Sequence, residues 1–115
     1  MKRDPITTHI LDTARGCPAA GVSVTLSRRQ DGVHTVVGES TTDSDGRIMC
    51  GLIPPSQFRP GVYEIRFAME PYYRALGVEC FFPDVTVAFL VQVGSPHYHV
   101  PLLVSPFGYS TYRGS

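Results

Sequence analysis

The sequence predicts an all-β sandwich with one short helix. Apolar residues recur at every second position along several short segments, turn residues separate these segments, and a single stretch has the length and flanking residues of a helix. About seven or eight strands in a chain of 115 residues are typical of a β-sandwich. The chain is long enough for one hydrophobic core, so residues 1–115 are expected to form a single domain.

The first two predicted strands are residues 6–11 and 22–27, because apolar and polar residues alternate along both. In a strand, successive side chains point to opposite faces. Ile6 and Ile10 therefore share one face of the first strand, and His9 lies on the other.

Two turns are predicted in the next part of the chain. "QDG" at 30–32 predicts a hairpin turn before a third strand at 34–40. "TDSDGR" predicts a second turn through 43–46, where Asp and Gly supply side-chain acceptors and positive φ. Arg47 follows this turn directly. Alternation resumes at 62–69 and predicts another strand.

The helix is predicted at "PYYRALG", residues 71–77, because Pro favours the start of a helix and Gly its end. Residues 85–93 are almost continuously apolar and predict a buried central strand. Strands at 98–104 and near 109–113 complete the chain.

The 98–104 strand has apolar residues on both faces. One face carries Tyr98 and the other even-numbered residues, and the opposite face carries His97, His99, Pro101 and Leu103. Because both faces carry apolar residues, we expect one to face the core and the other a partner subunit or a covered cleft.

The charge balance argues against two classes of partner. Ten basic residues balance ten acidic ones, so no net positive field is expected to attract nucleic acid. The first residues lack the apolar core of a secretory signal, and no apolar stretch approaches the length of a membrane span. We therefore expect no membrane association and a cytoplasmic protein.

Three cysteines, Cys17, Cys50 and Cys80, are odd in number and far apart in sequence. This spacing fits neither a disulfide framework nor a metal knuckle, so buried reduced thiols are expected. No local pattern supports a catalytic cysteine.

The "HYH" motif at 97–99 allows three interpretations from its residues alone: hydrogen-bonded surface histidines, half of a metal site, or an acid/base site. A zinc site needs three or four ligands, and beyond His9 and His34 the sequence offers no evident further ligand. From residue type and position alone, His9 would be an ordinary histidine at a sheet edge and Arg47 a solvated surface arginine. Arg113 and Ser115 would belong to a frayed chain end.

Three segments together resemble the 5-hydroxyisourate hydrolases, the enzymatic relatives of transthyretin. They are "THILDTARGCPAAGV", "DGR" at 45–47, and the terminal "HYHVPLLVSPFGYSTYRGS". The resemblance spans residues 8–115, and the final YRGS is the most specific part, because it distinguishes these hydrolases from hormone-carrying transthyretins.

The resemblance implies a transthyretin-like (prealbumin-like) sandwich of two four-stranded sheets. It also implies a homotetramer, in which dimers formed edge to edge meet face to face and place the sites at the dimer–dimer interface. The implied reaction is hydrolysis of 5-hydroxyisourate to 2-oxo-4-hydroxy-4-carboxy-5-ureidoimidazoline during urate degradation, a part of purine catabolism. It implies no metal and no organic cofactor.

Site residues follow from the resemblance position by position. His9, Arg47, His99 and Ser115 match catalytic positions, and Tyr112, Arg113 and Gly114 match substrate-binding positions of a pocket wall from a neighbouring subunit. Either His9 or His99 would activate water while the other orients substrate or water, and Arg47 would stabilise developing negative charge.

Two other functions are compatible with such a sandwich. One is a transthyretin-like carrier of a small aromatic ligand, and the other is a structural module that acts by contacts alone. The resemblance argues against the carrier, since transthyretins have lysine and glutamate in place of His9 and Arg47 and lack the YRGS end.

Overall fold

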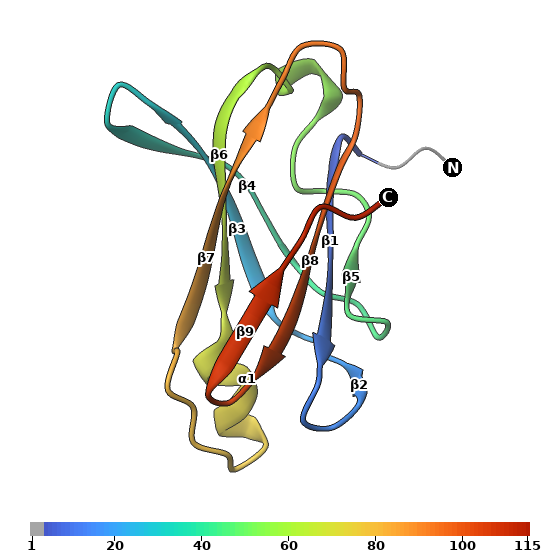
Figure 1. The fold of residues 1–115 in the computed structure, drawn as a ribbon, viewed down its shortest axis with the longest axis vertical. Helices are drawn as coiled ribbons and strands as arrows, with labels where there is room; N and C mark the ends of the chain where they lie inside the picture. The colour runs from blue at the N-terminus through green and yellow to red at the C-terminus, as the bar shows by residue number, and fades with distance from the viewer. Residues whose placement is uncertain (1–3) are drawn as a thin grey trace.

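Two β-sheets packed face to face make up the computed structural model, which describes residues 4–115 (Figure 1). The first sheet has the order β2-β1-β8-β9, and β5 also pairs with β1. Its strands are β1 (Ile6–Asp12), β2 (Cys17–Pro18), β5 (Arg47–Ile48), β8 (Tyr98–Ser105) and β9 (Gly108–Thr111). The second sheet has the order β4-β3-β6-β7, with β3 (Ser23–Gln30), β4 (Val33–Thr41), β6 (Gly61–Ala68) and β7 (Asp84–Val91). The predicted sandwich of two sheets is confirmed, and the first sheet has five strands where the resemblance implies four, because the short β5 also pairs with β1.

The core lies between the two sheets and follows the alternation of the sequence. On β1 the side chains of Ile6 and Ile10 are fully buried, as the pattern predicts. Alternate residues of β3, β6 and β8 belong to the same core: Val24, Leu26, Tyr63, Ile65, Phe67, Tyr98, Val100, Leu102 and Val104. The outward-facing side chains of the first sheet therefore do not belong to this core.

The hairpin between β3 and β4 turns at Asp31 and Gly32, as predicted. Their φ angles are +52° and +76°, so both central residues are left-handed. This is the backbone of a type I′ turn, whose twist matches that of the flanking strands.

Strand β1 pairs in parallel with β8 over its whole length, from Ile6 beside Tyr98 to Asp12 beside Val104. These strands lie about ninety residues apart in sequence, and nothing in their local patterns predicts that they pair. Beyond β9 the chain continues alongside β8 toward the start of that strand, and Gly114 forms an isolated bridge with His99 (Figure 1).

Helix α1 (Met69–Ala75) begins two residues before the predicted start at Pro71. Proline is tolerated in the first turn of a helix, so its position there marks the start only approximately. The carbonyl of Pro83 accepts hydrogen bonds from the amides of Met69 and Glu70, which satisfies two N–H groups at the helix start. A short 3₁₀ turn, η1 (Pro55–Gln57), precedes β6.

The prediction of a buried central strand at 85–93 is wrong. Strand β7 pairs with β6 alone and forms an edge of the second sheet. Its inward residue Val85 is buried, whereas Leu90 is 55% exposed. A run of apolar residues indicates cover on both faces, but it does not say whether a neighbouring subunit provides that cover.

The cysteine prediction is half right. All three thiols are free, but Cys50 is exposed and Cys17 and Cys80 are only partly buried. Cys17 begins β2, Cys50 lies in the loop after β5, and Cys80 lies in the loop between α1 and β7, where it packs against the edge of the core.

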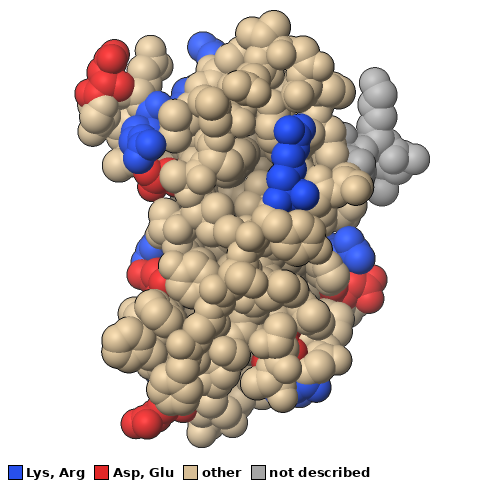
Figure 2. Space-filling view, in the orientation of Figure 1, with Lys and Arg blue, Asp and Glu red and all other residues tan. Residues whose placement is uncertain are grey.

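Charged side chains are scattered over the surface, and the view in Figure 2 shows no large area of one sign. This distribution agrees with the balance of ten basic and ten acidic residues. Within residues 4–115, no helix has the length and apolar character needed to cross a membrane.

Candidate active site

Pairing within the first sheet brings together residues from three distant parts of the sequence, β1, β5 and β8. His9 on β1 lies opposite Arg47 on β5 and opposite Pro101 on β8. His99 on β8 lies opposite Thr7 on one side. The outer face of this sheet therefore carries both predicted histidines and the predicted arginine.

A tight turn holds Arg47 beside His9. The carboxylate of Asp43 accepts hydrogen bonds from the amides of Asp45, at 2.9 Å, and Arg47, at 3.0 Å. Gly46 has a φ of +72°, and its carbonyl accepts a hydrogen bond from the amide of Ile10 at 2.8 Å. The turn is thus attached to β1 next to His9, which explains why the "DGR" sequence needs its glycine.

The pKa of His9 lies below its ordinary value of about 6.5. Burial is the main cause, and the positive charge of Arg47 is the second. A hydrogen bond with the backbone of Asp45 and the charges of Asp43 and Asp45 oppose these effects. His9 is therefore predominantly neutral near pH 7, as an imidazole must be to accept a proton.

His99 is held more tightly than His9, with 8% of its surface exposed. The distance from its Nδ1 to the hydroxyl oxygen of Thr7 is 2.8 Å. Its carbonyl accepts a hydrogen bond of 2.8 Å from the amide of Gly114. A Cβ atom added to Gly114 would lie 2.6 Å from Cδ2 of His99, so only glycine fits at this position.

The rest of the chain end lies differently. The guanidinium of Arg113 covers the ring of Tyr98, with its Cζ 4.4 Å from the ring centroid, and donates a hydrogen bond of 3.4 Å to the carbonyl of His97. Arg113 and Tyr112 also line a cavity of about 300 Å³ beside β7 and β8. Arg113 is thus directed to the open edge of the sandwich, and Ser115 is exposed directly after Gly114.

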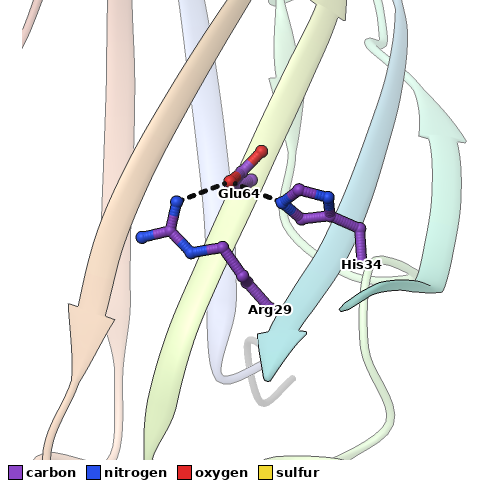
Figure 3. Close-up of polar contacts among 3 residues, drawn as sticks. All are labelled: Arg29, His34 and Glu64. Atoms are coloured by element: carbon purple, nitrogen blue, oxygen red, sulfur yellow. Dashed lines mark hydrogen bonds and ion pairs between the residues drawn. The ribbon is translucent and has the colours of Figure 1, made fainter. Parts of the chain in front are cut away.

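His34, which we considered as a metal ligand together with His9, lies on β4 of the other sheet. Its Nε2 is 3.1 Å from a carboxylate oxygen of Glu64, and Arg29 forms an ion pair of 3.1 Å with the same oxygen (Figure 3). Among residues 4–115, no group of three His, Cys, Asp or Glu side chains lies close enough to hold a metal ion.

The sequence analysis missed Thr7, and it noted Asp43 only as a turn residue and His97 only as part of the HYH motif, without a specific role in the site. Thr7 contacts His99, Asp43 holds the turn before Arg47, and His97 lies near Thr7 with 3.4 Å between its Nε2 and the hydroxyl oxygen. Thr7 precedes His9 by two residues and thus shares its face, which was the one available signal.

The fold and this polar outer face define a transthyretin-like sandwich protein. The chain belongs to the HIUase/Transthyretin family, whose model matches residues 6–114. This confirms the family predicted from the three sequence segments.

Proteins similar to this chain include 5-hydroxyisourate hydrolases and a transthyretin that binds thyroxine. The 5-hydroxyisourate hydrolase of Pseudomonas aeruginosa is 42% identical over 114 residues, which cover 96% of this chain and 90% of that protein. The structure of the Klebsiella pneumoniae 5-hydroxyisourate hydrolase matches with a TM-score of 0.82 and 33% identity, over 96% of this chain and 98% of that one. Sea bream transthyretin, solved in complex with thyroxine, matches with a TM-score of 0.90 and 35% identity, over 96% and 94%. The fold is therefore shared by the hydrolase and the thyroxine-bound transthyretin.

Proposed function

We propose that this chain is a hydrolase that opens the six-membered ring of 5-hydroxyisourate, in the degradation of urate. The observation that carries the proposal is the arrangement of His9, Arg47 and His99 on one sheet face. The relatives named 5-hydroxyisourate hydrolase, which match nearly the whole chain, support the choice of substrate.

Ring opening needs three things: a deprotonated water, stabilisation of the oxygen that becomes negative, and a proton for the leaving nitrogen. Two imidazoles and a guanidinium provide these functions. His9 and His99 act as proton acceptor and as orienting group for water or substrate. Arg47 binds carbonyl oxygens through its planar fork and stabilises their developing charge.

The chain end supplies the remaining groups. Ser115 offers a hydroxyl and a carboxylate next to Gly114, which lies against His99. Tyr112, Arg113 and Gly114 contribute to substrate binding by walling the pocket of a neighbouring subunit. The assembly is a homotetramer, a dimer of dimers with its sites at the dimer–dimer interface.

Exposed apolar side chains support this assembly. Leu90 on the edge strand β7 is 55% exposed, and Tyr109 on the edge strand β9 is 43% exposed. Both edges also carry unpaired backbone groups, which another subunit can pair. Sedimentation of the intact protein tests this, with a tetramer as the expected species.

A cytoplasmic location is part of the proposal. Its support is the three free cysteines, which are typical of a reducing compartment.

The activity test generates 5-hydroxyisourate in place with a urate oxidase and follows its ultraviolet decay. We expect the intact protein to accelerate the decay and a variant lacking Ser115 to lose most of this effect while it stays folded. If the intact protein does not accelerate the decay, the hydrolase proposal is wrong. The carrier function, favoured by the likeness to transthyretin bound to thyroxine, would then be tested by ligand binding.

A further inference from the structure

The hydroxyl of Thr7 lies between two histidine rings. Its oxygen is 2.8 Å from Nδ1 of His99 and 3.4 Å from Nε2 of His97. Nδ1 of His97 is in turn 3.0 Å from the backbone carbonyl oxygen of Asp4. Thr7 is fully buried, so this series of contacts is protected from solvent at its centre.

For neutral imidazoles, the chemistry of the groups gives the direction of each hydrogen bond. A carbonyl oxygen only accepts, so Nδ1 of His97 carries the proton that bonds to Asp4. In neutral His97 the Nε2 atom then has a lone pair and accepts the hydroxyl hydrogen of Thr7. Because a hydroxyl has one hydrogen, the Thr7 oxygen is left to accept from Nδ1–H of His99.

We propose that Thr7 and His97 are positioning residues that hold neutral His99 with its proton on Nδ1 and its lone pair on Nε2. This inference rests on the proposed function and assigns the general base within it to His99. In the other tautomer, Nε2 would carry a proton and could not accept one from water.

The proton balance of the step is simple. Water gives a proton to Nε2 of His99, and its oxygen forms a bond to the ring carbonyl carbon of the substrate. The carbonyl π electrons move onto the carbonyl oxygen, where Arg47 stabilises the charge, and they re-form the double bond in the next step. When the carbon–nitrogen bond breaks, His99 returns this proton to the leaving nitrogen and is neutral again. While His99 is cationic, its bond to Thr7 is charge-assisted and therefore stronger.

The strand register explains why Thr7, rather than its neighbour on β1, contacts His99. Thr7 is paired directly with His99 across the parallel strands, so its side chain lies beside the ring. Thr8, the next residue, lies on the opposite face and donates its hydroxyl hydrogen to the carbonyl of Val100 at 2.6 Å. Thr8 is a matched control, because it is also a buried threonine of β1 but does not contact His99.

The first test compares Thr7→Val, Thr7→Ser and Thr8→Val. Valine has the shape of threonine without the hydroxyl, so we expect Thr7→Val to lower kcat about 10- to 100-fold with little change in KM. Thr7→Ser keeps the hydroxyl and is expected to restore most of kcat. Thr8→Val is expected to lower thermal stability and leave kcat unchanged. Full kcat in Thr7→Val would overturn the inference.

Two variants of His97 separate its donor from its acceptor. The side-chain oxygen of glutamine stands near the position of Nε2, so His97→Gln can still accept from Thr7. Asparagine reaches only the position of Nδ1, so His97→Asn can donate to Asp4 but not accept from Thr7. We expect kcat to fall more in His97→Asn than in His97→Gln, and the reverse order would contradict the proposal.

The decisive measurement needs no substrate. Nitrogen-15 chemical shifts of the His99 ring at about pH 8, where ordinary imidazoles are neutral, report which nitrogen carries the proton. We expect a protonated Nδ1 and an unprotonated Nε2 in the intact protein, and two averaged shifts in Thr7→Val. A protonated Nε2 in the intact protein, or shifts that do not depend on Thr7, would overturn the inference. Failure of the proposed function would show instead as absent hydrolysis by the intact protein.

Discussion

Gly114 lies against the ring of His99 so closely that a Cβ atom at residue 114 would be 2.6 Å from Cδ2 of the histidine. The same glycine donates its amide hydrogen to the carbonyl of His99 at 2.8 Å. The contact and the hydrogen bond therefore fix the position of the chain end relative to His99. The close approach explains why residue 114 in the terminal YRGS is a glycine.

Replacing Gly114 by alanine is expected to displace the ring of His99, the chain end, or both. A displacement of about 1 Å at a reacting group costs roughly 100-fold in rate, so we expect kcat to fall by about this factor. Gly108→Ala is the control, because its added Cβ would meet only Ser105 Oγ at 3.8 Å. Hydrolysis rates of the two variants, with their melting temperatures, check the prediction. Equal activity in both would show that the contact has no role in the reaction.

Replacing Arg47 by alanine is expected to lower the hydrolysis rate about 10²- to 10³-fold, as for the loss of one donor to a developing oxyanion. Stability should change little, since Arg47 is only partly buried. The matched control is Arg66→Ala on the outer face of the second sheet, where Arg66 is exposed and paired with Asp84 at 2.8 Å. Near-full activity of Arg47→Ala would exclude the role proposed for this arginine.

The pKa of His9 is expected below 6.5 in the folded protein and closer to 6.5 in Arg47→Gln, because the positive charge that disfavours a second cation is gone. Proton NMR titration of the ring measures both values, with Arg66→Gln as a control that leaves the pKa of His9 unchanged. A pKa of His9 that stays the same or falls in Arg47→Gln would contradict this account.

The same shift predicts how His9 contributes to stability at acid pH. Since the folded state holds the His9 proton less tightly than the unfolded chain, protonation of His9 favours unfolding. Its contribution to the free energy of unfolding is therefore intact above about pH 6.5 and is lost as the pH falls through the folded-state pKa. Urea denaturation of the intact protein and of His9→Gln is expected to show a smaller loss of stability in the variant over this range.

The turn before Arg47 is expected to tolerate no side chain at Gly46. An alanine there would adopt a φ of +72° and place its Cβ 2.6 Å from the carbonyl oxygen of Ile10. Gly16 has a similar φ of +68° with nothing within 4 Å, so Gly16→Ala isolates the backbone cost of about 1–2 kcal/mol. We expect Gly46→Ala to lose more stability than Gly16→Ala and also to lose activity, because Arg47 moves. Equal losses from the two variants would show that the turn adapts to the added atom.

Several features of the site were accessible from the sequence, for reasons that are local. Alternation placed His9 opposite the core residues Ile6 and Ile10, and the Asp and Gly residues of 43–46 indicated a turn directly before Arg47. The edge position of β7 was not accessible, because an apolar run has the same appearance whether its cover belongs to the same chain or to another subunit. The partly exposed cysteines were missed because their sequence spacing says nothing about burial.

By itself the sequence determined the sandwich class, the faces of the strands, the turns and the family, because each of these depends on residues close together in the chain or on motif segments. Only the tertiary structure decided that β1 lies in parallel beside β8, with Thr7 beside His99, and that Gly114 returns to the same histidine. The physical reason is that a period of two assigns the face of each side chain but neither the partner strand nor the register. Both of these are set by how all the strands pack around one core, and they determine which hydroxyl lies beside which imidazole.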